Sequence, residues 1–238
     1  AAEDRTVRVE TAGTHPAALD DEPTPKLDAF TEELSGTTVT FEMLPVPGGT
    51  VTVETADGPK EVEVAPFYMG KTEVTWDEYD VFVYGLDEDD SGEFDAESRP
   101  SRPYVPPDLG YGHNGYATIS VAALGAECYC KWLTYKTGKT YRLATEAEWQ
   151  LACELGGISA DAIDAHGWHK GNADNTPHEV GSKDADALGF HDLYGNVREW
   201  VHKLDGTAVA IGGSFMDEAG EVGCAARHEY TRMWQDTD

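Results

Sequence analysis

Apolar and polar residues alternate along the first part of the chain, and this alternation predicts β-strands. It runs from Thr38 to Val53 with a break at Pro45–Gly49, and a period of two is typical of a strand with one buried face. The dipeptide Asp57-Gly58 follows, which favours a tight turn between strands. A second alternating run, Lys60–Val64, comes after it. We therefore expect a β-hairpin to open the domain.

Helical spacing replaces the alternation further along the chain. Thr75-Trp76-Asp77-Glu78 has the pattern of a capping box, in which the threonine accepts a hydrogen bond from the backbone and the glutamate reaches back. Apolar residues then recur at three- and four-residue spacing, which indicates a buried helix face: Trp76, Tyr79, Phe82 and Val83. A second capping box, Thr145–Glu148, predicts a helix that carries Trp149 and Cys153.

A further helix is expected between these two. Ser120 is a suitable cap for its start, and Gly138 is suited to close it after about Lys136. One side of this helix carries the repeating residues Val121, Leu124, Cys128, Trp132 and Tyr135. Cys130 and Leu133 fall on another side, so burial on more than one flank is expected. Tyr141-Arg142-Leu143 is interpreted as a short strand.

Several segments lack either period. Residues 1–38 are acidic and are expected to form an extended arm with a short helix at Lys26–Leu34, or alternatively a disordered leader. Asp87–Glu97 is an acidic loop, for which a weak cation site is the alternative to a solvated insertion. Arg99–Tyr116 is rich in Pro, Gly and Tyr and is expected to be irregular. His166–Asp192 is a long polar connection.

Composition narrows the class of protein. The 238 residues suit one large domain, and 25 glycines and 12 prolines favour a loop-rich fold. A formal net charge of −28 repels nucleic acid and anionic membranes and attracts divalent cations, although solubility alone could explain it. No apolar stretch approaches the roughly 18 residues of a membrane span. Ala1-Ala2-Glu3 looks like a newly cut mature terminus, so an extracytoplasmic protein, periplasmic or secreted, is expected.

The cysteines and histidines give only weak evidence for disulfides or a metal site. Four cysteines, Cys128, Cys130, Cys153 and Cys224, allow zero to two disulfides, and the first two are too close in sequence to bridge easily on a helix. A transition-metal site could be imagined at His166, His169 and His178. Gly167 argues against the helix that would align the first two, so loop histidines are the favoured interpretation.

The stretch GFHDLYGNVREWV, Gly189–Val201, concentrates candidate chemistry. Asp192 and Glu199 flank a predicted turn at Tyr194-Gly195-Asn196. Such a turn can direct carbonyl oxygens between two carboxylates, which is the ligand set that Ca²⁺ prefers. The alternative is a plain turn with Asp192 as its cap and Glu199 on the surface.

Five further blocks, together with LYGNVREW, resemble the formylglycine-generating enzyme, or sulfatase-modifying factor, family. LYGNVREW is similar to the family's LYxxxGNVWEW signature. The other blocks fall in the family's order: LPVPGGTV (Leu44–Val51), APFYMGKTEVTWDEYDVF (Ala65–Phe82), CYCKWLTYKTGKTYRLATEAEWQLAC (Cys128–Cys153), IGGSF (Ile211–Phe215) and CAAR (Cys224–Arg227). The resemblance implies an α+β, C-type-lectin-like fold over residues 39–238, with few helices around small antiparallel sheets.

The resemblance also implies metal ligands. It places one calcium on the side chains of Asp192 and Glu199 and on the carbonyls of Gly195 and Val197. It suggests a second calcium on the side chain of Asn172 and the carbonyl of Ala173. The further ligands of that second site have no clear counterpart in Pro177–Leu188.

The catalytic thiols of the family are not where the resemblance puts them. Family members hold Cu(I), a soft ion, on a pair of cysteines. The corresponding positions here fall at Asp217 and near Val222, so copper is not expected. Cys224 matches a structural cysteine, and Arg198 replaces the second tryptophan of the signature. Ser214, beside the family's oxygen-binding pocket, and Arg227 remain weak binding candidates. The iron-dependent sulfoxide synthase branch would need an additional helical domain, for which this chain has no room.

Three functions follow as hypotheses. The first is a non-catalytic, calcium-stabilised binding or structural module, a subunit of an extracytoplasmic assembly. The family's last strand, beside Thr38–Val46, has no counterpart here, so other protein subunits could supply it; a disordered tail or proteolytic nicking are alternatives. The second is a sulfatase-modifying oxidoreductase that converts cysteine to formylglycine. The third is a variable ligand-binding lectin-like protein with its diversity around Asp217–Trp234.

Overall fold

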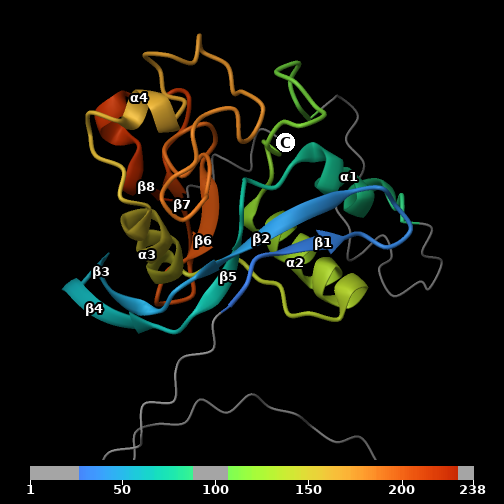
Figure 1. Cartoon of the computed structure of the whole chain (residues 1–238), viewed down its shortest axis with the longest axis horizontal. Helices are drawn as coiled ribbons and strands as arrows, with labels where there is room; N and C mark the ends of the chain where they lie inside the picture. Colours follow the sequence, from blue (N-terminus) through green and yellow to red (C-terminus); the bar gives the residue numbers. More distant parts are fainter. Residues whose placement is uncertain (1–26, 88–106, 230–238) are drawn as a thin grey trace, which may run out of the picture.

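The computed structural model describes residues 27–87 and 107–229 (Figure 1). In Figure 1, α1 and α2 lie on one side of the molecule and α3, α4 and the strands β6–β8 on the other, with β2 running between them. The described residues therefore form helices around small antiparallel sheets, as predicted. Most of the predicted acidic loop Asp87–Glu97, and part of Arg99–Tyr116, lie outside the described residues.

The N-terminal strands form a three-stranded antiparallel sheet and a separate hairpin. The sheet has the order β1 (Phe30–Glu33), β2 (Thr40–Val46), β5 (Phe67–Gly70), and the hairpin joins β3 (Gly49–Thr55) to β4 (Gly58–Val64). Gly58 has a φ of +104°, a left-handed conformation that suits glycine at this turn. The predicted hairpin at Asp57-Gly58 and the break before Gly49 are confirmed.

The short helix expected at Lys26–Leu34 is wrong over its described residues. Phe30–Glu33 is a strand, with Phe30 opposite Met43 of β2. Pairing across the sheet, together with full burial of Leu34, overrides the local preference. β2 is paired with β1 over Thr40–Met43 and with β5 over Met43–Val46. Each edge of β2 is thus paired over part of its length, and the supply of a further strand by a partner stays a prediction.

Helices α1 (Trp76–Tyr84) and α3 (Glu146–Gly156) both begin with the predicted capping boxes. Thr75 accepts from the backbone of Glu78, whose carboxylate accepts from the Thr75 N–H at 3.1 Å. Thr145 and Glu148 repeat the arrangement, with the return bond at 2.8 Å. Each pair satisfies backbone donors that would otherwise be unpaired at the helix start.

Helix α2 (Ala123–Thr137) corrects two expectations. It begins after Ala122 instead of Ser120, because Ser120 has a φ of +59°, outside the extended conformation of a capping residue. Leu124, expected in the buried stripe, is 63% exposed, whereas Tyr129, Trp132 and Leu133 are buried. Gly138 closes the helix in the left-handed conformation, as predicted.

The C-terminal half carries a second three-stranded antiparallel sheet. It has the order β6 (Glu199–His202), β7 (Ala208–Gly212), β8 (Gly223–Glu229). The remaining short elements are α4 (Ile163–His166) and the 3₁₀ turn η1 (Ala219–Glu221). The strand expected at Tyr141–Leu143 does not form. Instead, Ala144 accepts from the His202 N–H at 3.0 Å, and only Thr145 makes an isolated bridge to β6.

A disulfide joins α3 to β8 within the main core. Cys153 and Cys224 are bonded, and Cys128 and Cys130 are free. Trp149, Phe190 and Val209 are fully buried around Cys153. A second cluster packs Phe82 of α1 against Trp132 of α2. The sequence left zero to two disulfides open, and the fold selects one.

Candidate functional site

The predicted turn at Tyr194-Gly195-Asn196 is built on left-handed backbone. Gly195 has a φ of +101°, and a Cβ there would lie 2.0 Å from the carbonyl oxygen of Trp168, so only glycine fits. Asn196 is fully buried. Its Oδ1 accepts from the His178 N–H at 2.9 Å, and its Nδ2 donates to Glu73 at 2.6 Å. The turn is therefore a rigid, hydrogen-bonded bend.

Glu73 connects this bend to the N-terminal half, a role that the sequence motifs do not indicate. It lies between β5 and α1 and is 6% exposed. Its second oxygen accepts from the Val197 N–H at 2.9 Å. The signal was available, because Glu73 belongs to the EVT of the block that resembles the family. Its contact with a segment more than 100 residues away could not be read from spacing.

The two carboxylates expected to bind calcium flank the bend in a region short of positive charge. Asp192 is 2% exposed; its Oδ2 accepts from the Gly181 N–H at 2.7 Å, and its Oδ1 has no hydrogen-bond partner among the described residues. Within the described chain no Lys or Arg pairs with Asp192 or Glu199. An unpartnered buried carboxylate oxygen beside a second carboxylate is the donor set that suits a hard cation.

The three acidic side chains of this region repel one another. Burial, followed by the charges of Asp192 and Glu199, raises the pKa of Glu73 well above its ordinary value. Burial also raises the pKa of Asp192. Loss of solvation, with a smaller contribution from the charge of Asp192, raises the pKa of Glu199 to about 7. A bound cation would relieve this repulsion.

The described residues contain no group of three or more His, Cys, Asp or Glu side chains placed to hold a metal ion. The predicted calcium set uses two such side chains and the carbonyls of Gly195 and Val197, so it stays a prediction. In the suggested second set, Asn172 Oδ1 already accepts from the His169 N–H at 2.9 Å. The Ala173 carbonyl accepts from the Thr176 N–H at 3.1 Å. These two atoms thus serve the local turn, and their calcium also stays a prediction.

The three histidines once considered as a cluster make separate contacts. His166 Nδ1 lies 2.9 Å from the Asp184 carbonyl. His169, 4% exposed, has Nε2 at 2.7 Å from Asp164 Oδ1. The ring of His178 stacks on Trp168 with centroids 3.7 Å apart. Each ring is thus part of local packing in this connection.

Asp217, which the resemblance places at the first family cysteine, forms a salt bridge with Arg198. Asp217 accepts from Arg198 Nη2 at 2.8 Å on Oδ1 and 2.9 Å on Oδ2, and from the Ser214 hydroxyl at 2.9 Å. His228 Nε2 lies 3.6 Å from Asp217 Oδ2. Burial, followed by the charge of Arg198, lowers the pKa of His228. Arg198, which the resemblance places at the second tryptophan of the signature, thus neutralises Asp217.

The second position and the other weak candidates are part of the scaffold. Val222 is 9% exposed and packs against Gly213, where an added Cβ would lie 2.8 Å from it. Arg227 pairs with Glu146 and donates to Gln150 Oε1 at 3.2 Å, which ties β8 to α3. Ser214, predicted as a binding candidate, is 5% exposed and donates to Asp217.

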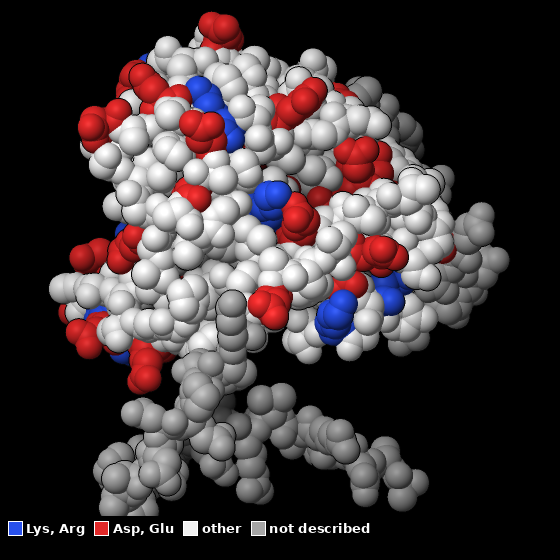
Figure 2. Space-filling view, in the orientation of Figure 1, with Lys and Arg blue, Asp and Glu red and all other residues white. Residues whose placement is uncertain are grey.

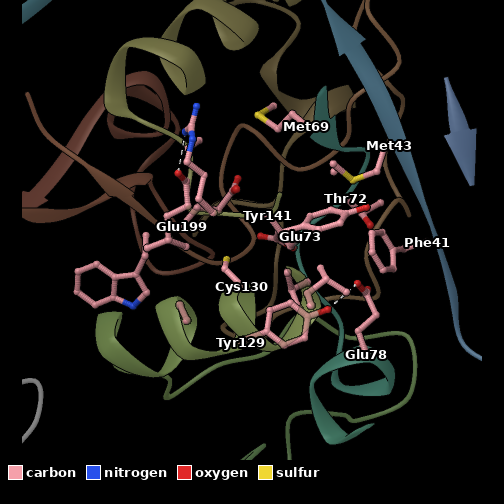
Figure 3. Close-up of a pocket in the computed structure, with 18 of the residues that line it drawn as sticks. Phe41, Met43, Met69, Thr72, Glu73, Glu78, Tyr129, Cys130, Tyr141 and Glu199 are labelled. Carbon is pink, nitrogen blue, oxygen red and sulfur yellow. Dashed lines mark hydrogen bonds between the residues drawn. The ribbon is translucent and has the colours of Figure 1, made fainter. Parts of the chain in front are cut away.

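A pocket of about 610 Å³ lies between the N-terminal sheet, α2 and β6 (Figure 3). Motif spacing does not reveal this pocket, because its walls come from segments far apart in the chain. Apolar side chains such as Phe41, Met43 and Met69 form much of the lining, and Glu73, Glu78 and Glu199 also reach it. Cys130 is part of the wall, and burial followed by the charge of Glu127 raises the pKa of its thiol to about 12. A thiol in that state is a poor nucleophile and metal ligand.

On the face shown in Figure 2, acidic side chains outnumber basic ones. Figure 2 shows Asp and Glu side chains spread over the viewed face, with few Lys or Arg among them. No helix of the described residues is long and apolar enough to cross a membrane.

Comparisons with known proteins place the fold. Residues 31–237 match the family described as "Sulfatase-modifying factor enzyme 1-like domain". Among solved structures, Treponema denticola variable protein 1 is similar with a TM-score of 0.65 and 19% identity, over 87% of this chain and 94% of that one. PvdO from Pseudomonas aeruginosa is similar with a TM-score of 0.60 and 21% identity, over 86% of this chain and 92% of that one. CarF is similar with a TM-score of 0.55 and 19% identity, over 80% of this chain and 92% of that one. The search of curated proteins gave no match.

Proposed function

The chain belongs to the sulfatase-modifying factor enzyme 1-like family, and we propose that it is a non-catalytic, calcium-stabilised binding or structural module within an extracytoplasmic assembly. The observation that carries this proposal is the pairing of Asp217 with Arg198 at the former cysteine position. A carboxylate engaged by a guanidinium offers no soft ligand for Cu(I) and no thiol for redox chemistry. Val222, buried near the second position, offers none either.

Calcium is proposed at the bend on four ligands. The side chains of Asp192 and Glu199 would hold it together with the carbonyls of Gly195 and Val197. The unpartnered Oδ1 of Asp192 supports this assignment. When bound, the ion would supply positive charge between carboxylates that otherwise repel one another. Its role here is therefore stability of the bend rather than chemistry.

Binding is proposed at the surface beside Asp217. Met216 next to it is 65% exposed, and Tyr111, 40% exposed, packs edge-on against Phe215. Exposed methionine and aromatic side chains are enriched in protein interfaces. The Cys153–Cys224 disulfide supports an oxidising, extracytoplasmic location. The similarity to the Treponema variable protein, at 19% identity, concerns the fold. A variable ligand-binding protein is therefore kept as a second kind of binding module.

The alternative is an oxidoreductase that converts a sulfatase cysteine to formylglycine with a different active site. The test is to incubate the protein with Cu(I), O₂ and a peptide containing CxPxR, and to follow the cysteine by mass spectrometry. We expect the peptide thiol to remain unchanged. Production of formylglycine above a protein-free control would overturn the non-catalytic proposal.

A further inference from the structure

The charged residues that line the 610 Å³ pocket do not balance. Its three basic residues are each paired: Lys139 with Glu32, Arg142 with Glu148 and Arg198 with Asp217. Two of its five glutamates are paired as well, Glu42 with Lys71 and Glu148 with Arg142. The remaining three have no Lys or Arg partner among the described residues: Glu73, Glu78 and Glu199.

Glu78 stands apart from the other two. Glu73 and Glu199 belong to the bend, where the amide of Asn196 and the proposed calcium account for them. Glu78 lies on α1 and is 6% exposed. Its Oε1 accepts from Thr75 through the hydroxyl at 2.8 Å and the backbone N–H at 3.1 Å.

The other oxygen of Glu78 is poorly satisfied. Among the described residues, Glu78 Oε2 accepts only from the Tyr129 hydroxyl, at 3.5 Å (Figure 3). That distance is at the outer limit of a hydrogen bond, so this buried oxygen lacks a strong donor. The structure thus places a carboxylate oxygen with free accepting capacity in the wall of an apolar pocket.

The surroundings of this oxygen define the rest of the ligand. Phe41, Met43, Met69 and Val121 line the pocket, and its volume is within the range of small-molecule sites, roughly 300–1,000 Å³. A more open hollow of about 800 Å³ adjoins it, because Phe41, Glu42, Thr72 and Glu78 line both. A ligand could therefore approach Glu78 from this side.

We infer that the pocket binds a small organic cation, an ammonium group on an apolar body, with the ammonium at Glu78 and the body against Phe41 and the two methionines. The ammonium would supply the missing donor to Glu78 Oε2 and the missing positive charge. The apolar body would displace water from the lining. Arg198 lines this pocket and pairs with Asp217, but Asp217 itself is not among the lining residues. The inference does not depend on whether the protein is catalytic.

The test compares two probes of one shape. Isothermal titration of the full chain uses 4-phenylbutylamine and 4-phenylbutan-1-ol at about pH 8, where a carboxyl whose pKa is raised to about 7 is mostly ionised. We expect saturable binding of the amine with an affinity at least about tenfold above that of the alcohol, because a charged hydrogen bond is stronger than a neutral one. Equal affinities, or no saturable binding of the amine up to millimolar concentration, would overturn the proposal.

Two variants localise the effect. Glu78→Gln keeps an acceptor for Thr75 and is expected to remove the preference for the amine while the thermal unfolding transition stays cooperative. Glu61→Gln, at an exposed position of strand β4, removes one charge elsewhere and is expected to leave the preference unchanged. If Glu78→Gln retains the preference, the ammonium does not bind where we place it.

A third probe separates a free ligand from a protein side chain. A blocked lysine amide carries the same ammonium on an aliphatic chain without an aromatic body. It is expected to bind at least about tenfold more weakly than 4-phenylbutylamine, because it buries less apolar area. Equal binding would assign the pocket to a lysine of a protein partner and contradict the small-molecule inference.

Discussion

The guanidinium of Arg198 donates to both carboxylate oxygens of Asp217, at 2.8 and 2.9 Å from a single nitrogen. The resemblance places Arg198 at the second tryptophan of the family signature and Asp217 at the first cysteine. The two changes are explained together, since a buried carboxylate without a partner would be costly. The pair ties the residue before β6 to the loop between β7 and η1.

This pair is expected to be energetically coupled. Asp217→Ala leaves Arg198 unpaired, and Arg198→Ala leaves Asp217 unpaired. The losses in the free energy of unfolding of the two single variants should therefore add up to more than the loss in the double variant. Because the Asp217 side chain is 13% exposed and that of Arg198 29%, we expect a coupling energy of about 1–2 kcal/mol. A double-mutant cycle from urea unfolding measures it. Additive effects within about 0.3 kcal/mol would show that the contact is incidental.

Calcium is expected to stabilise the bend. With calcium at about 100 times its dissociation constant, the free energy of unfolding should rise by about 3 kcal/mol relative to protein in EDTA. Thermal unfolding in the two buffers measures this. Asp192→Asn should abolish the response, because it removes one ligand charge, whereas Glu61→Gln should retain it. An unchanged transition temperature in calcium and EDTA would refute the metal site at Asp192 and Glu199.

Glu78 gives a prediction for pH. Burial raises the pKa of its carboxyl from 4.5 to about 7, so the folded state holds a proton that the unfolded state releases. The associated stability is present below about pH 4.5 and is lost as the pH rises to about 7. Between about pH 4.5 and 7, wild type should therefore lose on the order of 3 kcal/mol of unfolding free energy relative to Glu78→Gln. Parallel pH profiles of the two proteins would contradict the assignment.

The disulfide is expected to contribute strongly. Cys153 and Cys224 are 71 residues apart. A cross-link over such a loop lowers the conformational entropy of the unfolded chain, which stabilises the folded state by about 4 kcal/mol. The double variant Cys153→Ala, Cys224→Ala should show a correspondingly lower urea midpoint. Cys128→Ser is the matched control, because that thiol is free. A midpoint equal to that of the control would mean that the bond adds little.

Local signals in the sequence predicted local structure well. The capping boxes at Thr75 and Thr145 and the turn at Gly58 were found because a few adjacent residues decide them. The start of α2 was misplaced because Ser120 adopts a left-handed conformation that its type does not announce. Phe30–Glu33 became a strand only because β2 pairs with it.

In the candidate site, too, local motifs are predictable from the sequence and long-range contacts are not. The bend at Asp192–Glu199 could be located from its motif, as could the altered positions Asp217 and Arg198. The bond between them could not, since it depends on how β6 meets the loop after β7. Glu73 and the pocket around Glu78 were missed for the same reason, because both are assembled from segments that are distant in sequence.

The most direct test of the account is the metal content of the protein after equilibration with Ca²⁺ and Cu(I) together. The measurement uses the variant Cys128→Ser, Cys130→Ser, which removes both free thiols, and mass spectrometry of the metals after dialysis. We expect about one equivalent of calcium, bound at the bend, and no stoichiometric copper. Stoichiometric copper, or the absence of retained calcium, would contradict the claim that this fold keeps its hard-cation site and has lost its soft one.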